Sequence, residues 1–161
     1  MEAGKPGVFK HRPTVAELNR LAAGTVIERL GIVLTEQGDD FLRGTMPVEP
    51  RTHQPMGYLH GGASLVLAET LGSVAANYVV DRAVQRCLGQ EINANHLRPV
   101  SEGMVIGTAR PFHLGARSQV WSIEIRDPRE RLVCISRLTV AVIEWRPNPG
   151  QKTAQDQNSW K

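Results

Sequence analysis

The stretch that decides the fold is residues 60–80, HGGASLVLAETLGSVAANYVV. As a helix, this segment would carry apolar residues on almost every side, which predicts a buried helix from about Gly61 to Val80. Glu69, Ser73 and Asn77 recur every fourth residue, so they form one narrow polar stripe. Burying an unpaired carboxylate is costly, and the stripe must therefore face a partner, water or a cleft.

The segments on either side of this helix predict strands. A capping box at Thr14 and Glu17 starts a short helix that ends near Gly24. Strand patterns follow over 25–36 and 41–48, joined by a hairpin at 37–40, and four more come after the long helix, over 88–97, 104–112, 119–126 and 132–145. Strands and helices do not alternate. We therefore expect an α+β fold in which one long central helix is wrapped by an antiparallel sheet of about five to six strands.

The length of 161 residues fits one domain, expected over 14–145 between a flexible leader (1–13) and a disordered tail (146–161). The net charge of +3 is not concentrated in a basic patch, which gives little support to nucleic-acid binding. The leader lacks the apolar core of a signal peptide, and the long helix holds too many polar residues to span a membrane. We expect a cytoplasmic protein with two reduced cysteines, Cys87 and Cys134, and no membrane partner.

Chemistry is expected at the start and the middle of the long helix. Gly61 and Gly62 leave backbone N–H groups open at its positive end, where a developing oxyanion would be stabilised. Glu69 lies about 12 Å further along the axis, too far to act on the same atom. Two antiparallel copies of the helix would bring them together, which suggests a site shared between subunits. A structural role is the alternative: Glu69 would pair with an arginine and His60 would cap the helix.

Several motifs together resemble the hotdog-fold acyl-CoA thioesterases. They are RTHQPMGYL (51–59), HGGASLVLAETLGS (60–73), EINANHLRPV (91–100) and HLGARSQVWSIEI (113–125). The nearest resemblance is to the phenylacetate-type branch, which includes 1,4-dihydroxy-2-naphthoyl-CoA thioesterase and the enterobactin proofreading thioesterase. It covers about residues 15–144. The resemblance implies a hotdog fold, a homodimer that forms the site across its interface, and association into a homotetramer.

The resemblance also implies roles for individual residues. Glu69 matches the catalytic carboxylate, a nucleophile or general base, and Gln54 the glutamine that positions water or substrate. The Gly61 N–H matches the donor that polarises the thioester carbonyl, and His60 the histidine beside it. Expected substrate contacts are Met56, Gly62, Thr70 and Ser73. Expected contacts to coenzyme A are His96, Arg98, Gly115, Ala116, Arg117 and Ser118, with a surface role as the alternative for Arg117.

The expected reaction is hydrolysis of an acyl-CoA thioester, with an aryl acyl group, to the free acid and CoA. It needs no metal or other cofactor, and no His, Cys, Asp or Glu cluster has metal-ligand spacing. The Gly-x-Ser-x-Gly motif of serine hydrolases is absent. Two alternatives stay open: a hotdog dehydratase or hydratase acting on acyl-CoA or acyl-carrier protein, and a non-catalytic acyl-CoA-binding module.

Overall fold

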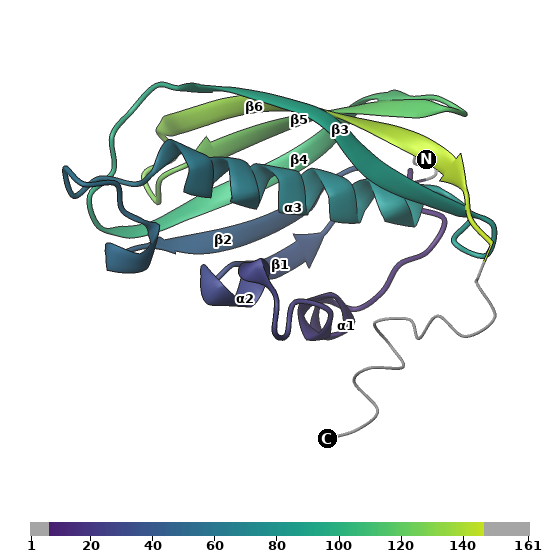
Figure 1. Ribbon diagram of the computed structural model, residues 1–161, viewed down its shortest axis with the longest axis horizontal. Coiled ribbons are helices and arrows are strands. Elements are labelled where there is room, and N and C mark those ends of the chain that lie inside the picture. Colours follow the sequence, from purple (N-terminus) through teal and green to yellow (C-terminus); the bar gives the residue numbers. More distant parts are fainter. Residues whose placement is uncertain (1–6, 147–161) are drawn as a thin grey trace, which may run out of the picture.

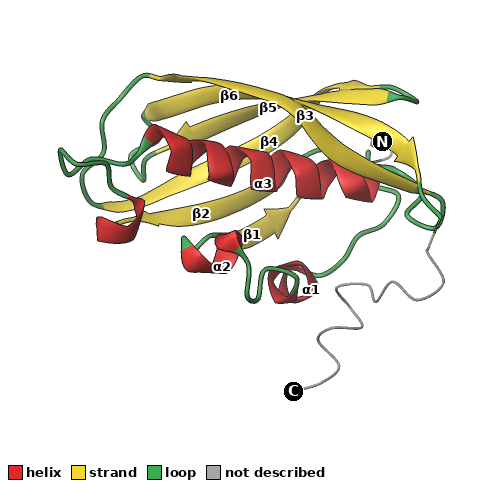
Figure 2. Cartoon of the chain, viewed as in Figure 1, coloured by secondary structure: helices red, strands yellow, loops and turns green. Residues whose placement is uncertain are grey.

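The computed structural model describes residues 7–146, which form one antiparallel sheet with a long helix across one face (Figures 1 and 2). The strand order is β1-β2-β4-β5-β6-β3, and every neighbouring pair is antiparallel. The helices are α1 (Val15–Arg20), α2 (Val26–Arg29) and α3 (Gly61–Val79). The strands are β1 (Val33–Gln37), β2 (Leu42–Val48), β3 (Gln85–His96), β4 (Gly103–Leu114), β5 (Ser118–Arg126) and β6 (Leu132–Glu144). This architecture confirms the predicted fold class and strand number.

The core lies between α3 and the sheet. Leu67 and Leu71 of α3 are fully buried, as are Trp121 and Ile123 on β5. The helix approaches β6 so closely at Gly72 that a Cβ there would lie 2.6 Å from a methyl carbon of Leu138. Apolar residues alternate along β5 with polar ones on the outer face, as the sequence predicted.

One predicted strand begins later than expected. Residues 25–36 were expected to be extended throughout, but α2 occupies the first part and β1 begins only at Val33. Thr25 caps α2, because its hydroxyl accepts the Ile27 N–H at 3.2 Å. Gly24 and Gly31 adopt positive φ on either side of this turn of helix, so the chain reverses there instead of extending.

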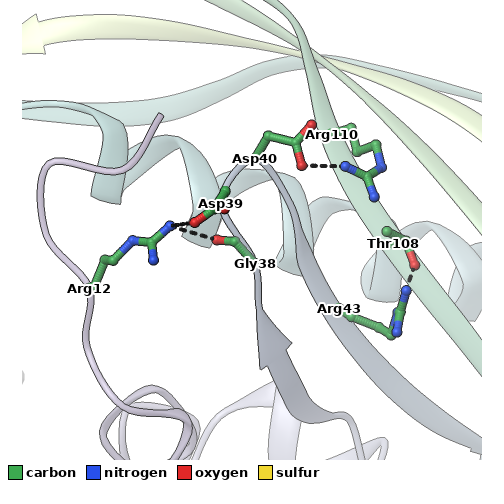
Figure 3. A network of polar contacts seen from close by, with 7 residues as sticks. All are labelled: Arg12, Gly38, Asp39, Asp40, Arg43, Thr108 and Arg110. Carbon is green, nitrogen blue, oxygen red and sulfur yellow. Dashed lines mark hydrogen bonds and ion pairs between the residues drawn. The ribbon is translucent and has the colours of Figure 1, made fainter. Parts of the chain in front are cut away.

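Residues 7–13, which precede α1, pack against the domain. Phe9 is buried in the core, and the Val8 N–H donates to the Asp39 carbonyl at 2.9 Å. Arg12 holds the β1–β2 turn by pairing with the Asp39 carboxylate and donating to the Gly38 carbonyl (Figure 3). In the same network Asp40 pairs with Arg110, and Arg43 donates to Thr108 (Figure 3). The expected tail, from residue 147 onward, lies outside the described residues.

None of the helices within residues 7–146 is long and apolar enough to cross a membrane.

Candidate functional site

His60 is the residue that precedes and caps α3. Its Nδ1 accepts the Gly62 N–H at 2.8 Å, so His60 is the N-cap of the helix. A neutral imidazole that accepts at Nδ1 carries its proton on Nε2, which leaves a second donor at the helix start. Within the described residues the Gly61 N–H meets no acceptor. The helix start therefore presents a backbone donor at the positive end of a 19-residue helix.

The loop that carries Gln54 is fixed against this helix start. The His60 N–H donates to the carbonyl of Thr52, a residue whose side chain is buried, at 2.8 Å. The Gln54 N–H donates to the Tyr58 carbonyl at 2.8 Å, and its side-chain oxygen accepts the Met56 N–H. The Gln54 carboxamide is thus oriented by the turn, while its NH₂ group has no acceptor among residues 7–146. Met56, expected to contact substrate, is 77% exposed in the single chain.

His96 also belongs to the helix start. A Cβ on Gly61 would lie 2.7 Å from its Nε2, so the imidazole lies directly over that glycine. The Leu59 N–H donates to the Val100 carbonyl at 2.7 Å and ties the two segments together. Arg98, two residues further on, is exposed. The sequence placed His96 and Arg98 in the CoA-binding group, and the structure places His96 beside Gly61.

Glu69 lies in different surroundings. Its side chain is exposed, and within residues 7–146 no basic group forms an ion pair with it and no donor forms a hydrogen bond. The carboxylate lies over β3, where Oε1 is 2.6 Å from the position that a Cβ on Gly89 would take. The structural alternative therefore holds for His60, which caps the helix, but not for Glu69.

The rest of the polar stripe faces the same strand. Asn77 accepts the Cys87 N–H at 2.9 Å and donates to the Cys87 carbonyl at 3.0 Å, a paired contact that joins α3 to β3. Ser73 is half-buried between these two positions, and its carbonyl also accepts from Asn77. Thr70, expected to contact substrate, is buried. The polar stripe thus runs from Asn77, whose side chain is hydrogen-bonded to β3, to Glu69, whose carboxylate has no partner within residues 7–146.

The turn over 115–118 connects β4 to β5. It is closed by the Gly115 N–H, which donates to the Ser118 carbonyl at 2.9 Å, while Ala116 and Arg117 are exposed. Ser118 pairs with Ala141 of β6, and Ala141 pairs with Leu88 of β3. The turn therefore lies at the level of Gly89, about 10 Å away across two strand spacings.

One chain thus holds two separate groups of predicted residues. The helix-start group contains Gln54, His60, Gly61 and His96. The carboxylate group contains Glu69 and the turn over 115–118. On β6 the partners of these groups, Cys134 for His96 and Ala141 for Ser118, are seven residues or about 23 Å apart.

The sequence reading missed Gly89. A glycine inside a strand pattern is a signal for a bulge or a close approach of another group, and it stands here in Leu88-Gly89-Gln90-Glu91. A β-bulge does interrupt the pairing of β3 with β6 between Gly89 and Glu91.

Other features of the described residues lie apart from both groups. A cavity of about 1000 Å³ at the far end of α3 is lined by leader and α1 residues together with Tyr78, Asp81 and Arg82, and by none of the predicted site residues. Within residues 7–146, no three His, Cys, Asp or Glu side chains are placed to hold a metal ion.

Comparison with known proteins supplies the family. The thioesterase superfamily model matches residues 56–134. The proofreading thioesterase EntH of Cronobacter sakazakii is 52% identical over 136 residues, 84% of this chain and 98% of that protein. The 1,4-dihydroxy-2-naphthoyl-CoA hydrolase of Escherichia coli K12 is 50% identical over 136 residues, 84% of this chain and 99% of that protein.

Solved structures of thioesterases share the fold of this chain. A thioesterase from Haemophilus influenzae superposes with a TM-score of 0.85 at 43% identity, covering 88% of this chain and 99% of that one. A mutant thioesterase from Pseudomonas aeruginosa gives the same TM-score at 42% identity, covering 86% and 100%. The chain belongs to the thioesterase superfamily, and its reaction class is the hydrolysis of thioesters.

Proposed function

We propose that the protein hydrolyses acyl-CoA thioesters, with an aryl acyl group, to the free acid and CoA. The observation that carries the proposal is the pair of unsatisfied groups on α3. Gly61 offers an N–H with no acceptor, and Glu69 offers a carboxylate with no ion-pair partner, both within the described residues. Thioester hydrolysis needs both: a donor for the developing oxyanion and a base or nucleophile for the attack.

Each group has a defined role in the proposed reaction. The Gly61 N–H polarises the thioester carbonyl, and the Nε2–H of His60 is a second donor at the same helix start. Glu69 either takes a proton from the attacking water or attacks the carbonyl carbon itself, forming an anhydride that water then opens. In both routes the C–S bond breaks, water supplies the oxygen of the acid, and the thiolate of CoA takes up a proton.

The proposed site is shared between two copies of the chain. Within one chain the helix-start group and the carboxylate group lie too far apart to act on one carbonyl. β3 is the last strand of the sheet, and within the described residues no strand pairs with its outer edge along its 12 residues. A long unpaired edge favours pairing with another strand. Antiparallel association along β3 would bring Glu69 of each chain to Gly61 of the other and give two equivalent sites.

The outer face of the sheet supports further association into a tetramer. Phe112 is 71% exposed on it, and Ile135 is exposed as well. A depression of about 370 Å³, lined in part by Phe112, Asn95 and Arg137, lies on this face. Exposed apolar side chains grouped in this way are typical of interaction surfaces. Sedimentation velocity distinguishes the proposed tetramer from a dimer.

Binding of CoA is assigned to exposed basic residues near the two groups. Arg117 projects from the turn at the level of Glu69, and Arg98 follows His96 near Gly61. Within residues 7–146 neither arginine takes part in an ion pair. Guanidinium groups bind phosphate in a bidentate geometry, which suits the phosphates of CoA.

The aryl preference is supported by one relative's name. The Escherichia coli enzyme, 50% identical, is a hydrolase of 1,4-dihydroxy-2-naphthoyl-CoA, an aryl thioester.

A substrate panel tests the proposal. It contains benzoyl-CoA, 4-hydroxybenzoyl-CoA, 1,4-dihydroxy-2-naphthoyl-CoA, a short and a long aliphatic acyl-CoA and one carrier-protein thioester, with thiol release as the readout. We expect fastest release from an aryl-CoA and a loss of about 100- to 10,000-fold in kcat with Glu69→Gln. Wild-type rates for Glu69→Gln would overturn the role of the carboxylate. Binding of CoA thioesters without release would favour a binding module, and hydration of an enoyl thioester would favour a dehydratase.

A further inference from the structure

The edge strand β3 passes directly beneath the Glu69 carboxylate at Gly89. Gly89 faces α3, and Oε1 of Glu69 lies 2.6 Å from the position of the Cβ that Gly89 lacks. A carbon and an oxygen atom do not approach so closely, so the carboxylate occupies the space of a missing side chain. The next nearest atoms to that Cβ position are the Glu69 Cδ at 3.6 Å and a Leu138 methyl carbon at 3.9 Å. Of the three, only the carboxylate oxygen would collide with a methyl group there.

The bulge beside Gly89 sets which residues of β3 face the helix. Before it the odd-numbered residues face inward: Cys87 is buried and Gly89 meets Glu69. After it the even-numbered ones do, since His96 lies over Gly61. In a regular strand inward residues keep one parity, so without the extra residue His96 would face the opposite side. Because of the bulge between Gly89 and Glu91, residues of one strand face both the Glu69 carboxylate and the start of the helix.

We propose that Gly89 is a positioning residue for the reaction, and that the bulge at Gln90 is part of the same device. The inference rests on the proposed function, because it assigns to Gly89 the placement of the carboxylate used there. An alanine at position 89 would push the carboxylate aside while the rest of the strand keeps its pairing. Small displacements of a reacting group reduce turnover strongly.

Activity tests the proposal first. We expect Gly89→Ala to lower kcat by about 10- to 100-fold and to leave KM within about twofold, because substrate binding does not depend on the carboxylate position. Asn93→Ala is the matched control: it removes an exposed side chain from the same strand, on the face away from the helix, so kcat should stay within about twofold. A wild-type kcat for Gly89→Ala, or an equal loss in both variants, would overturn the proposal.

Rescue by a shorter acid provides a second activity test. Glu69→Asp withdraws the carboxylate by one methylene, away from the space above residue 89. We therefore expect Glu69→Asp to lower kcat by a smaller factor in the Gly89→Ala background than in the wild type. Equal factors in the two backgrounds would show that the positions act independently and would contradict the assignment.

A melting-temperature cycle tests the contact without any activity. Alanine suits a strand better than glycine, so Gly89→Ala should raise Tm more in the Glu69→Ala background, where nothing occupies the space, than in the wild type. Equal shifts in the two backgrounds would overturn the contact itself. The two failures are distinguishable: a wild-type rate for Glu69→Gln overturns the catalytic role of the carboxylate, whereas equal melting shifts overturn the contact between residues 69 and 89 whatever the rate.

Discussion

Gly61 and Glu69 carry complementary parts of the proposed chemistry, a backbone donor and a carboxylate. Each is left open by its neighbours: the His60 cap satisfies the Gly62 N–H and not that of Gly61, and no arginine in the described residues reaches Glu69. At the scale of single residues, the proposed function depends on groups that have no partner within the described residues.

Arg117 should affect binding more than turnover. Arg117→Ala removes a guanidinium that we assign to a CoA phosphate, a contact that is the same in substrate and transition state. KM for an acyl-CoA should therefore rise about 10-fold while kcat changes little. Arg129→Ala, which removes another exposed arginine at the opposite end of β5, serves as the control in the same steady-state assay. An unchanged KM for Arg117→Ala would make it a surface residue.

The two cysteines should be unreactive in the folded protein. Burial raises the pKa of Cys87 and of Cys134 from 9.0 to about 11. At pH 8 the thiolate fraction then falls about a hundredfold on folding, so the reaction with a disulfide reagent should be slow until denaturant is added. Because the folded-state pKa is raised, the two thiols contribute stability below pH 9 and lose it as the pH rises towards 11. Rapid labelling of both thiols in the native protein would contradict this burial.

At the scale of elements, the junction of α3 and β3 organises the site. The side-chain amide of Asn77 forms a pair of hydrogen bonds with Cys87, and Glu69 lies two turns of helix closer to the N-terminus, over Gly89. The helix thus holds the edge strand at one point and presents the carboxylate at another.

Asn77→Ala should loosen this junction. The change leaves the N–H and C=O of Cys87, a buried residue, without their partners, at a cost of about 1–3 kcal/mol in the free energy of unfolding. Urea denaturation measures this loss. The value of kcat should fall as well, because the part of β3 beneath the Glu69 carboxylate shifts. Asn93→Ala on the exposed face of β3, where the side chain donates to the Glu91 carboxylate, is the control and should cost less than about 0.5 kcal/mol. Equal losses in both variants would argue against a stabilising role for the Asn77 hydrogen bonds to Cys87.

The sequence predicted the long helix and the antiparallel sheet because each has a strong periodicity, 3.6 residues around α3 and 2 along β5. It failed over 25–36, where the apolar residues of a short capped helix resemble a strand. The polar stripe was also predictable, since Glu69, Ser73 and Asn77 share one face. Gly89 carries a sequence signal for a bulge or a close approach, but only the path of β3 beneath the carboxylate gives that glycine a role. The separation of His96 from Arg117 follows from strand pairing, which no local pattern contains.

At the scale of the whole molecule, residues 7–13 are part of the folded unit. The side chain of Phe9 reaches the core, whereas Arg12 holds the β1–β2 turn from the surface (Figure 3).

These two contacts should differ strongly in energy. Phe9→Ala leaves a cavity in the core and should cost about 3–5 kcal/mol in the free energy of unfolding. Arg12→Ala removes a solvent-exposed ion pair and should cost about 1 kcal/mol or less. Urea denaturation of both variants checks the contrast. A small loss for Phe9→Ala would mean that residues 7–13 contribute little to the fold.

Whole-molecule organisation also decides whether the proposed site exists at all, since one chain holds its two groups apart. Complementation between two defective variants tests this claim most directly. Glu69→Gln disables the carboxylate group, and Gln54→Ala disables the helix-start group. In a mixed dimer with a shared site, one site carries both defects and the other carries none.

The measurement is thiol release from an aryl-CoA after the two variants are unfolded and refolded together in equal amounts. A shared site predicts that two inactive proteins recover about a quarter of wild-type activity, because half of the dimers are mixed and half of the sites in those are intact. Each variant refolded alone should stay inactive. If the mixture stays as inactive as its components while mixed dimers are shown to form, each site lies within one chain and no site is shared between subunits.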